Sequence, residues 1–395
     1  MSKKTLPNFL LFVLCTFSLL QAFDYESSGY VKYLYSRTTY PFLTGTFNDQ
    51  LLHARWNQHW YFGQQWSFAL ESRWRTYYGN SVQRIPNFKN QIVHHYPLVD
   101  LGWTLVDKSE WFSYLEFDRL YLDYQGEKWE CTLGRQRIAW GTSLVWNIID
   151  LFNPLSILDF DYEEHPGSDA VRLQYFTGPV SHWEVAYAPA KTWKEQTAAL
   201  MWATHTGEYD WFFLLGIKRN RRMAGLAWSG YIKDAGFRGE LKISDAPGKG
   251  IPTTHPLPFL SPLTANDRAN IQAVVSFDYS FSNSLYLHSE ARFNRDGVLQ
   301  NAGYYQWQAA DADMLSPARW TLFQEVAYDL SPLVRADVFA LYNPNDHSYV
   351  VVPSLSWNMA TNWDVYVIGF LKEGAQNTEF GAMGKAGFLR LKFSF

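Results

Sequence analysis

Arginines and carboxylates alternate along several short stretches in the first half of this 395-residue sequence. A guanidinium presents a planar fork of donors that matches a carboxylate, so such residues on one surface either pair with each other or bind an anion. Both interpretations stay open: a salt-bridged wall, or a constriction whose transverse field orients anions or sugar acids. The candidate residues are Arg73, Arg75, Glu116, Asp118, Arg119, Arg135, Arg137 and Arg172.

Other kinds of chemistry find little support in the sequence. The ten histidines show no metal-ligand spacing, and His94 and His95 are neighbours that rarely share a face, so we expect no metal and no cofactor. His288 stands two residues from Glu290, but no serine can be assigned to it, so we expect no enzyme. The net charge of −4 gives no basic footprint for nucleic acid.

The segments that must carry these side chains alternate with a period of two. In 284–293, Leu285 and Phe293 face one way, and Glu290 and Arg292 face the other. A charge that faces lipid costs about 2–4 kcal/mol at the bilayer centre, and a surface this rich in charge stays wet. We therefore predict an all-β fold, a transmembrane antiparallel β-barrel whose charged face lines a water-filled interior.

The N-terminus fits export from the cytoplasm. Lys3 and Lys4 precede an apolar run that is too short to span a bilayer, which predicts a signal peptide over residues 1–22. The rest, 23–395, shows no linker and is expected to form a single barrel domain. Cys131 is then the one cysteine left, which excludes an intramolecular disulfide.

The last stretch, 387–395, reads GFLRLKFSF and alternates in the same way. Leu389 and its apolar partners face away from Arg390, and the chain stops on an aromatic residue. The last strand of a closed barrel must pair with the first, and an aromatic at the rim anchors that end. We expect Phe393 and Phe395 to close the barrel. Aromatic residues make up 18% of the chain, and many stand near segment ends, as membrane girdles require.

The count of alternating segments predicts about 18 strands, with 16 as the second choice because the first two strands and 79–112 are the least regular. Short turns alternate with long connections such as 139–167, the asymmetry expected of short periplasmic turns and long outer loops. An even strand number leaves both termini periplasmic. The expected strands cover residues 27–39, 48–61, 66–78, 113–124, 129–138, 168–176, 182–188, 198–206, 210–218, 222–233, 237–245, 270–280, 284–293, 318–329, 332–342, 348–359, 362–372 and 385–395.

The passage LGRQRIAWGTSLVWNIIDLFNP interrupts the alternation. A strict period of two would turn Arg135 and Arg137 toward lipid, and a bulge at Gly134 would turn both inward. The loop that follows, 139–167, is too apolar to sit in water, so we expect it to fold into the lumen as a constriction. Its tryptophans either stack sugar rings or pin the loop. The expected loop residues are Trp140, Trp146, Asp150 and Asn153.

This passage, continued through SDAVRLQYF at 168–176, resembles bacterial outer-membrane porins related to the alginate-export channels. In that group a strand reading like GRQ leads through a Trp-Gly pair into a loop that contains Asn-Pro. The closing strand also resembles the tag that the barrel-assembly machinery reads. The resemblance implies a single-chain channel of about 18 strands, and it does not imply alginate as the solute.

These observations favour a channel in the outer membrane for small hydrophilic solutes, with anions and saccharides as candidate classes. The expected partners are outer-membrane lipids, the barrel-assembly machinery and those solutes. Two alternatives stay open: a closed barrel with a structural or surface-polysaccharide-assembly role, and an outer-membrane enzyme, which needs a Ser/His/acid set.

Overall fold

The computed structural model describes residues 23–93, 98–153, 167–246, 268–311 and 314–395. Within these ranges no helix is long and apolar enough to cross a membrane. The expected signal peptide at 1–22 lies outside the described residues, as do His94 and His95.

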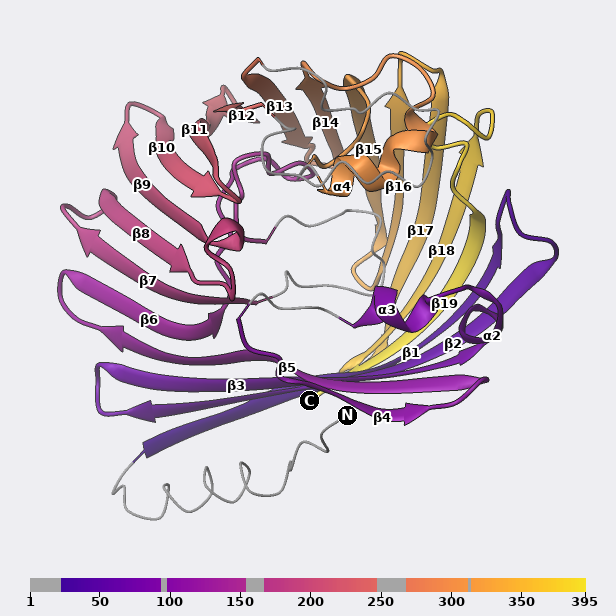
Figure 1. The fold of residues 1–395 in the computed structure, drawn as a ribbon, viewed down its shortest axis with the longest axis horizontal. Helices are drawn as coiled ribbons and strands as arrows, with labels where there is room; N and C mark the ends of the chain where they lie inside the picture. Colours follow the sequence, from indigo (N-terminus) through magenta and orange to yellow (C-terminus); the bar gives the residue numbers. More distant parts are fainter. Residues whose placement is uncertain (1–22, 94–97, 154–166, 247–267, 312–313) are drawn as a thin grey trace.

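Eighteen antiparallel strands form a closed ring (Figure 1). The sequence prediction of 18 strands is confirmed, and the alternative of 16 is wrong. The first nine strands in the ring are β1 (Phe23–Thr39), β2 (Thr46–Phe62), β3 (Trp66–Gly79), β5 (Trp111–Gln125), β6 (Trp129–Gln136), β7 (Ser168–Phe176), β8 (His182–Ala188), β9 (Thr197–Thr206) and β10 (Tyr209–Lys218). The others are β11 (Arg221–Ile232), β12 (Ala235–Ser244), β13 (Asn270–Ser280), β14 (Leu285–Asn294), β15 (Trp320–Ser331), β16 (Val334–Asn343), β17 (Ser348–Ala360), β18 (Trp363–Glu373) and β19 (Lys385–Ser394).

One further strand, β4 (Gly102–Asp107), lies outside the ring count. No strand is expected from the sequence over 79–112, and β4 shows that this expectation is wrong. β6 is short and pairs only with the second half of β5, from Leu120 onward. β4 covers the edge of the first half of β5, so that half is also paired on both sides.

Short helices lie only in the connections of the described chain. α2 (Asn80–Arg84) and α3 (Phe88–Ile92) follow β3, and α3 lies inside the ring (Figure 1). There Arg75 on the inner wall donates a 3.0 Å hydrogen bond to the carbonyl of Ile92. The remaining helices are η2 (Trp193–Glu195), η3 (Ala302–Tyr305) and α4 (Gln306–Asp311).

The ring closes between its first and last strands. β1 and β19 pair in register, with Tyr33 opposite Leu391. The pairing continues to the last residue: the amide of Phe395 donates to the carbonyl of Gly29 at 3.0 Å, and that of Gly29 to Phe395 at 2.9 Å. Each of the eighteen strands of the ring therefore has a neighbour on both sides.

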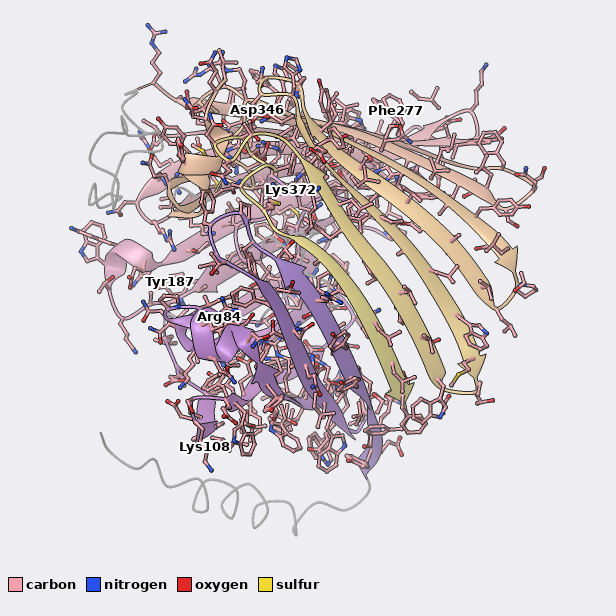
Figure 2. All side chains as sticks on the ribbon, turned by 90° about the vertical axis from the view of Figure 1, so that its right-hand side faces the viewer. Arg84, Lys108, Tyr187, Phe277, Asp346 and Lys372 are labelled. Carbon is pink, nitrogen blue, oxygen red and sulfur yellow. The ribbon has the colours of Figure 1, made fainter. Side chains whose placement is uncertain are left out.

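The two faces of the wall differ as the alternation requires. On β12, Leu241 and Ile243 are exposed on the outside, while Glu240 and Lys242 are buried inside. Figure 2 shows the barrel from the side, with Asp346 at the end that carries the long connections. We call this the long-loop end and the opposite one the short-turn end. The charged side chains that could contact a solute therefore lie on the inner face of the barrel.

Candidate functional site

The inner wall where β5 and β6 meet carries the distinctive glycine. Gly134 has a φ of 123°, and a β-carbon there would lie 2.3 Å from the carbonyl oxygen of Leu120, so only glycine fits. The predicted bulge at this residue is wrong, however. The pairing of β5 with β6 is continuous, and the register shift lies between β3 and β5, where Asp118 is the extra residue.

Arg135 and Arg137 therefore have different surroundings. The Arg135 guanidinium is 1% exposed and donates to Asp169 at 2.7 and 3.0 Å, to the Phe117 carbonyl at 3.0 Å and to the Val99 carbonyl. Phe117 and Asp169 belong to the barrel wall, and Val99 lies in the segment between α3 and β4. Arg137, just beyond the end of β6, is exposed and lines an inner pocket.

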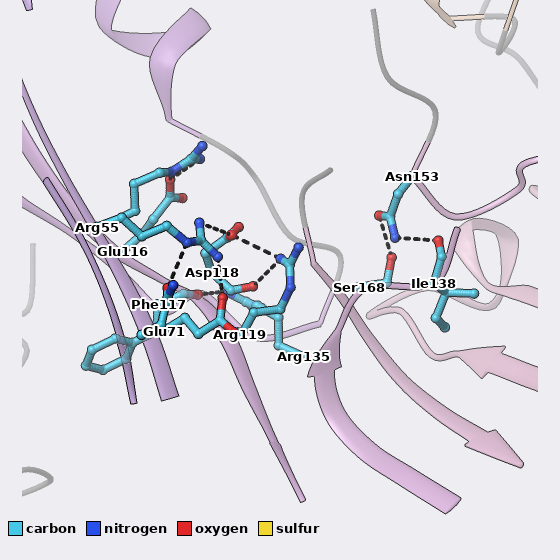
Figure 3. A network of polar contacts seen from close by, with 12 residues as sticks. Arg55, Glu71, Glu116, Phe117, Asp118, Arg119, Arg135, Ile138, Asn153 and Ser168 are labelled. Carbon is cyan, nitrogen blue, oxygen red and sulfur yellow. Dashed lines mark hydrogen bonds and ion pairs between the residues drawn. The ribbon is translucent and has the colours of Figure 1, made fainter. Parts of the chain in front are cut away.

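Most of the other candidate residues form a buried ion-pair network on β2, β3 and β5 (Figure 3). Arg119 contacts Asp118 at 3.0 Å, and Arg55 contacts the same carboxylate at 2.8 Å and also Glu71. Arg55 was not among the candidates. Its position two residues after His53 on the inward face of β2 is the signal that could have found it.

Two further arginines of β3, Arg73 and Arg75, share one carboxylate on the same wall. Nε of Arg73 lies 2.8 Å from Oε1 of Glu116, and Arg75 reaches the same oxygen at 3.0 Å. Glu116 and Arg73 are fully buried. A buried arginine needs such a partner. Removal of one partner of a buried ion pair leaves an unpaired charge and lowers the free energy of unfolding by about 3–5 kcal/mol.

Arg172 on β7 belongs to a separate pair. It holds Glu184 on β8 through two bonds of 2.6 and 3.0 Å. Glu184 also accepts a 2.7 Å hydrogen bond from the indole nitrogen of Trp140, at the start of the loop. This contact fixes the tryptophan by its polar edge, and its ring packs against Phe152.

The loop that starts after β6 runs along the inner wall of the barrel (Figure 1). Glu240 on β12 holds its first part. One carboxylate oxygen accepts the backbone N–H groups of Thr142 at 2.7 Å and Ser143 at 3.0 Å, and the other accepts that of Ile149 at 3.1 Å. A loop bent back on itself in this way presents several N–H groups to one anion.

Glu290 on β14 holds the middle of the loop in the same manner. It accepts the N–H of Trp146 at 2.8 Å on one oxygen, and those of Leu144 and Val145 at 3.2 and 3.3 Å on the other. The alternation of the sequence puts Glu240 and Glu290 on the inner face of their strands, but it does not show that they contact the loop. Backbone donors leave no mark in the sequence that could have shown it.

Apolar packing completes the seat of the loop. Ile148, Ile149 and Leu151 are each at most 2% exposed. The wall makes room for them with small inward residues: a β-carbon on Gly225 would lie 3.0 Å from Ile149, and one on Gly216 would lie 2.6 Å from Leu151. The apolar loop is thus buried on the wall of β7 to β18 instead of in water.

Asp150 and Asn153 close the base of the loop. Asp150 accepts the backbone N–H groups of Phe152 and Asn153, both at 2.9 Å, and burial raises the pKa of this loop carboxyl to about 6. The Asn153 amide donates to the Ile138 carbonyl and accepts from the Ser168 hydroxyl, both at 2.9 Å (Figure 3). These bonds join the two ends of the loop where it leaves and re-enters the wall.

A polar pocket of about 330 Å³ lies on the inner wall toward the short-turn end. It is lined by side chains of β2, β3, β5, β6 and β7. Arg119, Arg137 and Arg172 border it together with Asp123 and Glu130. The pocket is in the size range of small-molecule sites, although its lining is more polar than usual.

A serine missed by the sequence analysis stands beside His288. Ser276 on β13 places its hydroxyl 3.1 Å from Nε2, and Glu325 on β15 lies 3.3 Å from Nδ1. Glu290 also approaches Nε2, at 3.4 Å. Ser276 is fully buried. In the described residues no cluster of three or more metal-ligating side chains occurs.

No family model and no curated protein matches the chain. Solved structures match its fold. OccAB4 of Acinetobacter baumannii and OccK5 (OpdH) of Pseudomonas aeruginosa each give a TM-score of 0.57 at 8% identity, covering 94% of this chain and 98% of theirs. OccK8 (OprE) of Pseudomonas aeruginosa gives 0.54 at 9% identity with the same coverage. The likeness establishes the barrel fold. The resemblance to alginate-export channels rests on the sequence passage alone.

Proposed function

We propose that this protein is an outer-membrane channel through which small hydrophilic solutes diffuse. The observation that carries the proposal is the loop 138–153, which lies inside a closed barrel and is held on the wall by Glu240 and Glu290. A loop of this kind narrows a charged, water-filled passage without sealing the ring. The solved structures that share the fold are outer-membrane porins.

The outer surface supports a membrane location. Aromatic rings meet across neighbouring strands near the short-turn end: Trp129 and Tyr175 are 4.3 Å apart, and Trp66 and Tyr124 are 4.9 Å apart. Such girdles sit at the level of lipid headgroups. We place the short turns and both termini in the periplasm, with residues 1–22 acting as the export signal and the closing strand recognised by the barrel-assembly machinery.

Anions and hydroxylated solutes such as saccharides are the solute classes that we favour. Arg137 offers an inward guanidinium beside polar groups of the pocket, and anionic groups bind such forks well. The buried, paired arginines brace the wall and set the local field. Alginate itself is not proposed, because no set of residues that would contact it can be matched.

An enzyme is the less favoured function. Ser276, His288 and Glu325 contact one another like the serine, histidine and acid of a hydrolytic triad. However, a carboxylate oxygen lies near each of the two ring nitrogens of His288. An imidazole that donates from both nitrogens has no lone pair left to accept a serine proton. The buried serine also gives a substrate no access.

A sealed barrel is the second candidate. Lys32 and Arg73 face inward and are fully buried, so part of the lumen is filled.

Conductance in a planar bilayer distinguishes the open channel from the sealed barrel. We expect the folded protein to carry a steady ionic current in a planar bilayer, and replacing 141–149 by a short glycine linker to increase it. Shortening the exposed connection around Trp193 is the control and should change nothing. An absent current would refute the channel, and an unchanged one in the loop variant would place the constriction elsewhere.

A further inference from the structure

The outer wall of the barrel carries a hollow of about 440 Å³ that spans β13, β14, β15 and β16. Outward side chains form it, in two neighbouring rows that cross the four strands; Phe277 is labelled in Figure 2. The rows are Val275, Ala291, Leu322 and Tyr342, and Phe277, Ser289, Gln324 and Ala340. The volume is in the range of sites that hold a small molecule.

Small side chains between large ones make the hollow. Ala291, Ser289 and Ala340 are the small residues of its lining. Phe277 and Leu322 stand beside them and are 44% and 38% exposed, so they project from the wall on either side. The hollow is therefore a property of these side chains and not of a break in the sheet, because the pairing of the four strands is continuous here.

The two polar side chains of the lining are bonded within the wall. The Ser289 hydroxyl donates to Oε1 of Gln324 at 2.6 Å. The Gln324 amide donates to the carbonyls of His288 and Glu325, both at 3.0 Å. The O–H and N–H donors of the pair are thus already engaged, so an occupant of the hollow gains no donor from them. An apolar occupant suits this lining better than a polar one.

The hollow descends from the long-loop end toward the middle of the wall. Tyr342 is next to the last residue of β16, whereas Phe277 lies in the second half of β13. In the next row toward the long-loop end, the rings of Phe293 and Trp320 lie 4.8 Å apart. The Tyr342 hydroxyl contacts Nδ1 of His347 at 3.0 Å. Aromatic residues of this kind mark the headgroup level of a bilayer, so the hollow starts there and enters the acyl region.

We propose that this hollow binds one acyl chain of a membrane lipid in the leaflet at the long-loop end, and that this lipid stays longer than those around the rest of the wall. The chain fills the space over the small residues, and its headgroup lies at the level of Tyr342 and His347. An empty hollow would leave the lining atoms without contacts, and a flexible chain can follow its slope. The site rests on the membrane location that the proposed function requires.

Photolabelling in a bilayer tests the site. The folded protein is reconstituted in dioleoylphosphatidylcholine vesicles that contain a trace of phosphatidylcholine with a diazirine in one acyl chain. After illumination, mass spectrometry of the peptides locates the label. We expect the label to collect on 275–291 and 322–342 instead of spreading evenly over the outer wall. Ala291→Phe places a ring in the hollow and should lower the labelling there to the level of the rest of the wall.

Ala224→Phe is the matched control, because Ala224 is an exposed alanine on the outer face of β11, away from the hollow. It should leave the label in place. An excess of glycerophosphocholine, the headgroup without its chains, should not displace the label.

An even spread of label, equal labelling in the wild type and Ala291→Phe, or displacement by the headgroup alone would each overturn the site. A dimer in detergent that Ala291→Phe dissociates would also overturn it, because a second copy would then cover the hollow. Conductance is recorded on the same proteins and should be unchanged in both variants, since the hollow is on the outer wall. An absent current with label in the hollow refutes the channel and keeps the lipid site, and a current with evenly spread label does the reverse.

Discussion

Glu379 shows how one buried carboxyl can make the long-loop end sensitive to pH. It lies in the connection between β18 and β19 and is 3% exposed. Its carboxylate accepts bonds from the Ser316 hydroxyl and, at 2.9 Å, from the Asn343 amide. Burial raises the pKa of Glu379 to about 7, and Asp346 adds to this while Arg292 opposes it.

A raised carboxyl pKa stabilises the fold at low pH. In the unfolded chain the pKa of this carboxyl is about 4.3. Between this pH and about 7 the folded chain therefore binds the proton more tightly than the unfolded chain does. The stabilisation is complete below this window and is lost as pH rises through it. We predict that Glu379→Gln raises the unfolding free energy at pH 8 relative to the wild type, on the order of 2 kcal/mol, with little change at pH 4.5.

Thermal unfolding in detergent at the two pH values measures this. Glu373→Gln is the control, because Glu373 forms only an exposed ion pair with Lys385. If both variants follow the pH profile of the wild type, Glu379 does not titrate in this window.

At the scale of elements, the sequence predicted that the loop must be buried but not where. The run Trp146 to Ile149 is too apolar for water, and that is a local property of the chain. Its seat depends on Glu240 and on Gly225, which are 75 or more residues away and meet it only after the ring closes. A barrel fixes which strands lie opposite each other through 18 consecutive registers, and no single segment contains that information.

The β5–β6 region shows the same limit. Gly134 was correctly identified as special, because a glycine in a strand marks close backbone approach. The register shift instead lies at Asp118, in a stretch where the charged residues do not follow a clear period of two. Arg135 and Arg137 looked equivalent in the sequence, and the wall contacts of Arg135 distinguish them.

The loop's attachment can be tested through its two carboxylates. Glu240→Gln together with Glu290→Gln replaces each acceptor pair by one amide oxygen, so several backbone bonds to a charge are lost. Each is worth about 1.5–3 kcal/mol when the acceptor is charged. We expect amide hydrogen exchange over residues 142–149 to quicken by about tenfold or more. Glu325→Gln is the comparison, because Glu325 lies on the same wall and, within the described residues, makes no bond to the loop. Equal exchange in all three proteins would contradict the assignment.

At the scale of the whole molecule, closure depends on the two ends of the chain finding each other. β1 and β19 are separated by nearly the full sequence. The alternation of the last strand is clear in the sequence, whereas the first strand is among its least regular stretches. In the structure Tyr30 stands opposite Ser394, and the backbone of Phe395 bonds to Gly29, so the last residue of the chain lies beside the first strand.

Phe395 makes two separable contributions to this closure. Its backbone forms both bonds to Gly29, and its ring lies against the same glycine, where an added β-carbon would meet the ring at 2.8 Å. Phe395→Ala keeps the backbone pair and loses the ring, which is 52% exposed at the rim. Deletion of the residue loses both. We therefore predict less folded, heat-modifiable protein in the outer membrane for Phe395→Ala, and less again for the deletion.

Leu389→Ala is the matched control, because Leu389 stands on the same strand with similar exposure, 47%, on the apolar face away from the rim. It removes a comparable apolar area but no terminal contact, so its yield should stay near that of the wild type. The amount of heat-modifiable protein in membrane fractions gives the order. A deletion that matches the wild type would show that the other pairs of β1 and β19 suffice for closure, and a loss in Leu389→Ala equal to that in Phe395→Ala would assign the effect to apolar area rather than to the rim.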